Sequence, residues 1–187
     1  PPRSTLFPYT TLFRSPYPMI QKGILGYEGV ERRFEILATH PVTIIDDYAH
    51  NPCKVKAVLS AVRDRFPYNK VWCVFQPHQA SRTYLLLDEF SNAFGQADEI
   101  IVTDIFYARD TLEYRQKISG VELTRRICAH GKHAVSIPSM KDVPSYLQGK
   151  AQSGDVILTI GAGNIGELAH ALTYLNTSDH TLEFVGQ

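Results

Sequence analysis

The densest group of reactive side chains in this sequence lies in one short stretch, Asp46-Asp47-Tyr48-Ala49-His50-Asn51-Pro52. Carboxylates in such a stretch can hold Mg²⁺ or the hydroxyl groups of a ribose, and a histidine at a helix N-terminus can meet phosphate oxygens. The alternative is structural, with Asn51 capping the helix that follows and the two acids solvated. The density of reactive groups favours a ligand site, and both interpretations stay open.

A second group of polar side chains lies between Phe75 and Thr83 and contains His78 and Arg82. Its amide, imidazole, hydroxyl and guanidinium groups can bind a carboxylate or a phosphate through charge-assisted hydrogen bonds. A polar loop with a merely solvated arginine would have the same composition. Spacing alone therefore does not decide between a binding loop and a solvated one.

The third feature is the glycine pattern from Gly161 to Gly166, which matches G-x-G-x-x-G and follows an apolar run. Such a pattern between a strand and a helix is typical of dinucleotide-binding sites. Here it comes last in the chain, and only Glu183, about 20 residues further on, lies at the distance expected of a ribose-binding acid. We favour contact of the loop amides with a phosphate or carboxylate, or close packing of helix on sheet, and keep dinucleotide binding as the alternative.

The elements that must position these groups alternate between strand and helix. Apolar and β-branched runs predict buried strands at 42–46, 71–75, 99–103, 134–137 and 155–160. Helices are expected after the Asn51-Pro52 start signal, across 85–94, from the Ser119 and Glu122 capping box to Gly131, over 141–150 and through 168–172. The longer stretch from 104 to 118 is expected to be a loop.

This alternation predicts a Rossmann-like α/β domain, in which a mostly parallel sheet is covered by helices on both faces. Ligands of such sheets bind outside the carboxyl ends of the strands. The chemistry is therefore expected in the loops that follow the strands, at 46–51, 76–82, 104–109 and 161–166.

Composition narrows the class of protein. With 187 residues, of which 44% are hydrophobic, the chain can bury the core of one globular domain. Nineteen basic and 19 acidic residues give a net charge of zero, so no long-range field draws the protein to nucleic acid or to an anionic membrane. No apolar run approaches the roughly 20 residues of a membrane helix, and the N-terminus lacks the order of a signal peptide.

The three cysteines, Cys53, Cys73 and Cys128, are odd in number and widely spaced. They fit reduced thiols of a cytoplasmic protein better than a disulfide framework or a zinc site. We therefore expect a soluble cytoplasmic protein without a metal site of its own. A Walker-type sequence, G-x-x-x-x-G-K-[ST], is also absent, so ATP chemistry would require another domain.

Five segments, taken in order, resemble successive motifs of the Mur ligases, and within that family the ligases that join L-alanine to UDP-N-acetylmuramate. They span residues 29–35, 46–52, 75–83, 104–109 and 161–166, and the similarity extends over about residues 22–175. Both the order and the spacing agree, which makes the resemblance more specific than any single motif. A ligase of the same family with another amino-acid or peptide substrate is the alternative within the resemblance.

The resemblance implies an enzyme of three domains, of which this chain would hold the third and the end of the second. In the family, ATP phosphorylates the muramoyl carboxylate, and the amine of L-alanine attacks the acyl phosphate. ATP and Mg²⁺ would act only together with the missing central domain, and the chain alone would be inactive. The implied division is a non-native or disordered leader at 1–15, the end of the central ATPase domain and a hinge at 16–40, the C-terminal domain at 41–175, and a tail at 176–187.

The resemblance also implies roles for individual residues. Catalytic roles would fall to Arg33, Asp47 and His50, and the nucleotide would meet the same three together with Tyr48 and Asn51. The incoming L-alanine would be bound by His78 and Arg82, with Tyr107 and Arg109 nearby. Many family members have a second histidine where this chain has Asn51, and Gln79-Ala80 is a common variation of the histidine loop.

Overall fold

The computed structural model describes residues 16–26 and 29–177, with side chains described through Tyr174. The expected leader, 1–15, and residues 178–187 of the expected tail lie outside the described residues. The chain divides into two compact units, one ending at Val30 and the other beginning at Glu31.

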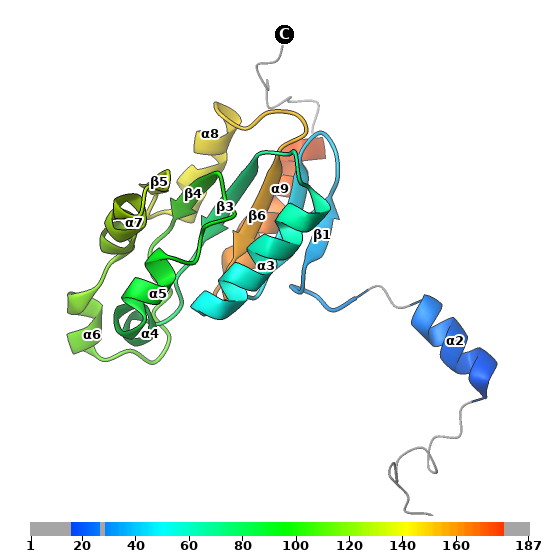
Figure 1. The fold of residues 1–187 in the computed structure, drawn as a ribbon, viewed down its shortest axis with the longest axis horizontal. Helices are drawn as coiled ribbons and strands as arrows, with labels where there is room; N and C mark the ends of the chain where they lie inside the picture. Colours follow the sequence, from blue (N-terminus) through cyan, green and yellow to red (C-terminus); the bar gives the residue numbers. More distant parts are fainter. Residues whose placement is uncertain (1–15, 27–28, 178–187) are drawn as a thin grey trace, which may run out of the picture. The chain divides into compact units, whose positions relative to one another are not determined.

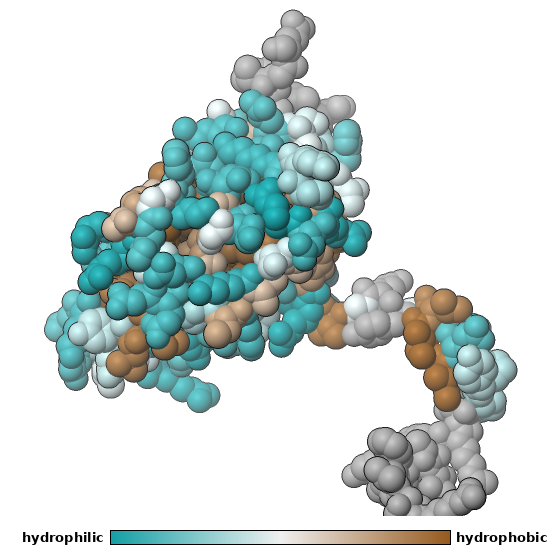
Figure 2. All heavy atoms as spheres, viewed as in Figure 1, coloured by the Kyte–Doolittle hydropathy of each residue, from teal (hydrophilic) through white to brown (hydrophobic). Residues whose placement is uncertain are grey.

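The described part of the first unit is the helix α2 (Tyr17–Leu25), which follows Pro16. None of its residues is buried. Figure 2 shows hydrophobic residues along one side of this helix, and its exposed apolar side chains are Tyr17, Met19, Ile20, Ile24 and Leu25. An amphipathic helix gains most of its stability by burying its apolar face, and the described part of this unit offers no other element to cover that face.

The second unit is built on a six-stranded sheet with the strand order β1-β2-β6-β3-β4-β5. Its strands are β1 (Glu35–Ala38), β2 (Thr43–Asp47), β3 (Val71–Phe75), β4 (Glu99–Val102), β5 (Ala134–Ser136) and β6 (Val156–Ile160). All neighbours are parallel except the edge pair of β1 and β2, which is antiparallel. The mostly parallel α/β sheet expected from the sequence is therefore confirmed.

The strand β1 was not expected. Its sequence Glu-Ile-Leu-Ala does not alternate between polar and apolar residues, and all four residues are only partly buried. Its pairing with β2, which includes an irregularity between Ile36 and Ala38, supplies the hydrogen bonds that define it as a strand. Residues 35–38, in the stretch assigned to the hinge, thus belong to the sheet.

The helices begin and end largely where local signals place them. The helix α3 (Pro52–Arg65) has Asn51 as its N-cap, whose Oδ1 accepts from Lys54 N at 2.9 Å. The helix α7 (Gly120–Ala129) has Ser119 as its N-cap. Only half of the expected capping box forms, because Glu122 donates its backbone N–H to Ser119 Oγ while its carboxylate pairs with Arg125 and Arg126. The last helix, α9 (Ile165–Thr177), follows the final glycine loop.

Three helical regions differ from the expectation. The single helix expected across 85–94 is instead two helices, α4 (Ala80–Leu85), which starts earlier, and α5 (Leu87–Ser91), because the backbone leaves helical geometry at Leu86. The expected loop 104–118 contains α6 (Leu112–Lys117), which packs on α4. The region 141–150 is a short 3-10 helix, Met140–Asp142, followed by α8 (Val143–Gln148).

The core lies on both faces of the sheet. On one face, α3, α5 and α7 pack against strand side chains such as Ile45, Cys73 and Phe75. On the other face, α8 and α9 pack against Ile44, Trp72 and other strand residues. Figure 1 shows α3 and α9 on these opposite faces. Among the described helices, none combines the length and the apolar character needed to cross a membrane.

Candidate functional site

The candidate site lies at the carboxyl ends of β2, β3, β4 and β6, four of the five mutually parallel strands. The loops after β2 and β3 meet here, since the ring centroids of His50 and His78 are 6.4 Å apart. The loop after β4 joins them through Phe106, whose ring stacks on His78 with 5.5 Å between centroids and an interplanar angle of 10°. The sheet thus brings together side chains that are up to 56 residues apart in the sequence.

The two acids at the end of β2 are buried rather than solvated. Asp46 and Asp47 are 2% and 9% exposed. The Asp47 carboxylate accepts the backbone N–H of Phe34 at 2.8 Å through Oδ2 and that of Ala49 at 2.7 Å through Oδ1. Asp47 therefore fastens the segment before β1 to the loop that carries Tyr48 and His50.

The loop after β2 presents aromatic and cationic groups to the candidate site. The rings of Tyr48 and His50 pack in a T-shaped arrangement, with 5.2 Å between centroids and an interplanar angle of 80°. The Arg33 guanidinium lies 5.7 Å above the centre of the Tyr48 ring. Arg33 is exposed, whereas the side-chain oxygen of Asn51 is engaged in capping α3. Of the candidate nucleotide-binding residues, Arg33, Tyr48 and His50 thus lie together.

The loop after β3 places a histidine and an arginine side by side. Arg82 Nη1 lies 3.5 Å from His78 Nδ1 and donates to the His78 carbonyl at 3.4 Å. Both contacts are at the long limit of a hydrogen bond, so the guanidinium is only weakly bound by its neighbours. Arg82 is therefore available to a carboxylate or phosphate that enters this edge.

Both histidines are held towards their neutral forms. Burial is the largest cause that lowers the pKa of His50, and Arg82 lowers it further, against the bond that the His50 ring makes with the Tyr48 carbonyl. Burial is also the first cause that lowers the pKa of His78, followed by Arg82 and His50. At neutral pH this edge therefore carries neutral imidazoles beside cationic guanidinium groups.

We expect both imidazoles to titrate below the usual value of 6.5 in NMR measurements on the folded chain. In the pH range between 6.5 and the lowered pKa values, the unfolded state binds more protons than the folded state. The free energy of unfolding therefore decreases as the pH falls through this range. Urea unfolding between about pH 7 and pH 5 measures this decrease. In a His50→Gln, His78→Gln double variant, the part of the decrease that comes from the two histidines should be absent. Glu122, whose pKa hydrogen bonding from Arg125 lowers to about 2, contributes only to the separate decrease below pH 4.5. A midpoint above 6.5 for either ring would contradict this expectation.

Arg32, rather than its neighbour Arg33, is the arginine that organises this edge. Its Nε donates to Asp46 Oδ2 at 2.8 Å, and its Nη1 and Nη2 donate to the carbonyls of Gly163 and Gly161 at 3.0 and 2.6 Å. Its backbone is in the left-handed region (φ 57°), and its carbonyl accepts the Tyr48 N–H at 2.8 Å. Sequence reasoning gave Arg32 no role. The signal available was the buried acid Asp46, which requires a cationic or hydrogen-bonding partner.

Asp110 is a second residue that sequence reasoning missed. Its carboxylate accepts the backbone N–H groups of Ala80 and Ser81 at 2.9 and 3.0 Å, and Ser81 Oγ at 3.0 Å. These hydrogen bonds lower the pKa of Asp110 against the opposing effect of burial. Asp110 thus fixes the start of α4, the helix that carries Arg82, and nothing in the local sequence pairs it with Ala80.

Tyr107 and Arg109 do not join the cluster of His50, His78 and Arg82. The ring of Tyr107 lies under the Arg115 guanidinium, 4.9 Å from ring centre to Arg115 Cζ. Arg109 is exposed, and within the described residues no hydrogen bond or ion pair joins it to that cluster. The part of this loop that does reach the cluster is Phe106.

The glycine loop after β6 faces protein groups at each of its three pattern glycines. A Cβ at Gly161 would lie 2.8 Å from the Gln76 carbonyl oxygen, and one at Gly163 would lie 2.3 Å from Gln76 Oε1. A Cβ at Gly166 would lie 3.1 Å from Arg32 Nε. The glycines are therefore explained by close packing within the protein, which favours the packing interpretation over a dinucleotide site.

The carboxylates at this edge do not form a Mg²⁺ site by themselves. Asp46 is paired with Arg32 and with Thr159 Oγ1, and both oxygens of Asp47 accept backbone N–H groups. Within residues 16–26 and 29–177, no three side chains of His, Cys, Asp or Glu are grouped so that they could hold a metal ion. A nucleotide fits better, because the exposed Arg33 guanidinium offers donors to phosphate oxygens.

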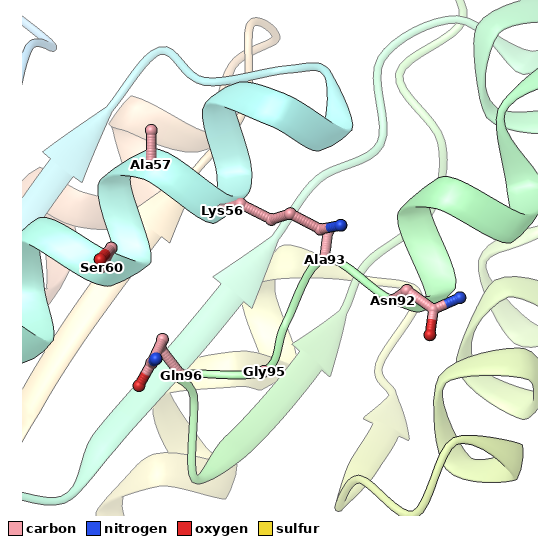
Figure 3. A pocket seen from close by; sticks show the side chains of 7 residues that line it. All are labelled: Lys56, Ala57, Ser60, Asn92, Ala93, Gly95 and Gln96. Atoms are coloured by element: carbon pink, nitrogen blue, oxygen red, sulfur yellow. The ribbon is translucent and has the colours of Figure 1, made fainter.

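A separate surface pocket of about 410 Å³ lies between α3 and the segment that follows α5. Figure 3 shows Lys56, Ala57 and Ser60 of α3 on one side and Asn92, Ala93, Gly95 and Gln96 on the other. None of the candidate site residues lines this pocket. The candidate site is thus separate from this pocket.

The sequence matches one family model over residues 32–163, that of the glutamate ligase domain of Mur ligases. The UDP-N-acetylmuramate--L-alanine ligase of Clostridium acetobutylicum is 40% identical over 144 residues, which make up 76% of this chain and 31% of that protein. The chain therefore spans about a third of the length of the curated relatives it matches.

The fold is also similar to solved structures. The UDP-N-acetylmuramate-alanine ligase of Thermotoga maritima matches with a TM-score of 0.68 and 22% identity, over 89% of this chain and 34% of that one. A murein peptide ligase of Psychrobacter arcticus matches with a TM-score of 0.66 and 16% identity, over 84% of this chain and 32% of that one. At these identities the two structures support the fold alone.

Proposed function

The chain belongs to the Mur ligase family, as its C-terminal domain, and on that premise we propose that it is part of an ATP-dependent ligase that joins L-alanine to UDP-N-acetylmuramate. The curated relatives at about 40% identity that carry this name support the choice of substrate. The structural observation that carries the proposal is the pairing of the partly buried His78 and Arg82 side chains at the carboxyl edge of the sheet.

L-alanine offers a carboxylate and an amine, and the cluster has a complement for each. The Arg82 guanidinium can donate two parallel hydrogen bonds to the carboxylate. The imidazole of His78, whose lowered pKa keeps it neutral, can accept a hydrogen bond from the amine. An amine that attacks an acyl phosphate must be unprotonated, so a neutral acceptor beside it favours the reactive form.

The nucleotide would approach from the side of the loop after β2. Arg33 would contact the phosphates of ATP, and Tyr48 and His50 would lie beside them. Asp47 would act near the ribose chiefly by holding this loop through its bonds to Phe34 and Ala49. The contribution of these residues to the reaction would be positioning and charge neutralisation.

ATP and Mg²⁺ would be bound mainly by a central domain that this sequence does not contain, as the absence of a Walker-type motif indicates. Residues 16–40 would hold the end of that domain and a hinge, except that β1 (Glu35–Ala38) pairs with β2 and so goes with the C-terminal domain. That domain would otherwise cover 41–175, with 176–187 as its tail. The same proposal places the protein in the cytoplasm, where three free thiols are stable.

A related ligase with another amino-acid or peptide substrate is the second candidate, since the matching family model, the glutamate ligase domain of Mur ligases, is not specific to L-alanine. The alternative of a dinucleotide-binding module has less support, because protein groups face all three glycines of its motif. Measured binding of NAD(H) that is lost when Gly163 is replaced by a bulky residue would support the dinucleotide-binding alternative.

A chimera tests the proposal. Residues 22–187 are joined to the N-terminal and central domains of a known L-alanine-adding ligase, and phosphate release is measured with and without L-alanine. We expect alanine-dependent release from the chimera, its loss in the His78→Ala and Asp47→Ala variants, and none from the chain alone. Activity of the chain alone would overturn the division into domains, and release with a different amino acid would favour the second candidate.

A further inference from the structure

The side chain of Phe106 connects the loop of His78 with the final glycine loop. Its ring lies nearly parallel to the His78 imidazole, with 10° between the planes. The Phe106 N–H donates to the Pro77 carbonyl at 2.8 Å, and the Phe106 carbonyl accepts the Gln79 N–H at 3.0 Å. These two backbone bonds flank His78 in the sequence, so Phe106 and His78 are held in fixed register.

Gly163 meets the same ring. A Cβ at this position would lie 2.7 and 2.8 Å from two carbons of the Phe106 ring, Cγ and Cδ2. Real Cβ atoms essentially never approach other heavy atoms within 3.0 Å. The lack of a side chain at Gly163 is therefore what lets the Phe106 ring lie where it can stack on His78.

The glycine loop is a firm support for the ring. The Arg32 guanidinium holds it by donating to the carbonyls of Gly161 and Gly163. The Gln76 side chain, which is 4% exposed, holds it from the sheet by donating from Nε2 to Asn164 Oδ1 at 3.0 Å. The loop and the ring can therefore be displaced only together with buried polar contacts.

We propose that the final glycine loop is a positioning element for the amino-acid site, in which Gly163 supports the Phe106 ring and Phe106 orients the imidazole of His78. The identity of the substrate as an amino acid rests on the proposed function. The orientation of His78 by Phe106 does not, and it can be measured in the chain alone. Phe106 and Gly163 are thus positioning residues, and the G-x-G-x-x-G pattern has a role that requires no nucleotide.

The test uses NMR on the whole 187-residue chain. The carbon-bound ring protons of His78, identified by their loss in His78→Gln, should be shifted upfield by the face of the Phe106 ring. Phe106→Leu keeps an apolar side chain but removes the ring, so these protons should move downfield and the pKa of His78 should rise as water reaches the imidazole. Phe106→Tyr keeps the ring and should preserve both values.

Gly163→Ala should move the same His78 signals, because the added Cβ would displace the Phe106 ring; since it would also meet Gln76 Oε1, its effect is judged together with that of Phe106→Leu. The matched control is Gly149→Ala, because Gly149 ends α8 with φ −84° and has no atom within 4 Å of an added Cβ. Unchanged His78 shifts and pKa in Phe106→Leu, or in a folded Gly163→Ala, overturn the proposal. If Gly163→Ala does not fold, the proposal is tested by comparing the His78 shifts and pKa of Phe106→Leu with those of Phe106→Tyr.

In the chimera, Phe106→Leu should raise the KM for L-alanine about tenfold and change the KM for ATP less than about twofold. A general loss of structure would raise both. Shifted His78 signals in the chain together with an inactive chimera would count against the proposed function and leave the positioning of His78 standing. If the chimera is active but neither Phe106→Leu nor Gly163→Ala changes the His78 signals, the proposed function stands and the positioning of His78 by Phe106 is overturned.

Discussion

Replacing Arg82 by alanine lowers kcat/KM for L-alanine by about 100-fold in the chimera, while the KM for ATP stays within about twofold. A guanidinium that binds a carboxylate makes two charge-assisted hydrogen bonds, and the bonds of Arg82 to His78 are too long to compete for them. The effect should therefore appear with the amino acid and not with the nucleotide. Initial rates at varied L-alanine and varied ATP measure it.

Two further variants give this prediction its controls. Arg82→Lys keeps the charge but not the planar fork, and should lie between the parent chimera and Arg82→Ala. Arg125→Ala removes an exposed arginine that pairs with Glu122 on α7 and should leave both KM values unchanged. If Arg82→Ala affects L-alanine and ATP equally, Arg82 does not bind the amino acid.

The largest loss of stability is expected for Asp46→Ala, which should lower the free energy of unfolding by about 3 kcal/mol. Asp46 is 2% exposed and accepts from Arg32 Nε at 2.8 Å and from Thr159 Oγ1 at 2.6 Å. Its removal leaves the half-buried Arg32 guanidinium without a counter-charge, with only the carbonyls of Gly161 and Gly163 as acceptors, and leaves Thr159 Oγ1 with its longer bond to the Ile45 carbonyl at 3.3 Å. Against a typical total of about 5–15 kcal/mol, this is a substantial part of the stability.

Urea unfolding followed by tryptophan fluorescence measures this loss, because the single tryptophan, Trp72, is 2% exposed in the folded chain. Adding Arg32→Met to Asp46→Ala should cost less than the two single losses combined, since no unpaired charge then remains. Glu122→Ala, which breaks exposed ion pairs with Arg125 and Arg126, should cost less than about 1 kcal/mol. Equal losses for Asp46→Ala and Glu122→Ala would show that the Asp46 pair is not the buried link described above.

Local sequence signals were sufficient for most elements of the fold. The apolar run at 42–46 predicts β2, and the Asn51-Pro52 pair predicts the start of α3, because capping and the preferred backbone angle of proline act within a few residues. Strands that alternate with helices then imply the mostly parallel sheet. The four strand-end loops were expected at one edge for the same reason, and three of them meet around His78.

Elements that depend on a partner were missed. The strand β1 is a strand because it pairs with β2, and α6 packs on α4, whereas neither has a strong pattern of its own. The sequence likewise left Asp46 and Asp47 either solvated or in a ligand site. Both are instead bonded to the segment before β1, through Arg32 and Phe34, and no local pattern shows that this segment passes close to them.

The sequence by itself determined the family, the sheet and the loops in which the candidate residues lie, because each of these depends on the order and spacing of residues along the chain. Only the tertiary structure decided which side chains face one another. Arg32 reaches the carbonyls of Gly161 and Gly163 across about 130 residues because β6 lies next to β2 in the sheet. Phe106 reaches His78 and Gly163 because β3 lies between β4 and β6. Strand order is set by the packing of the whole sheet, so no local pattern encodes these contacts.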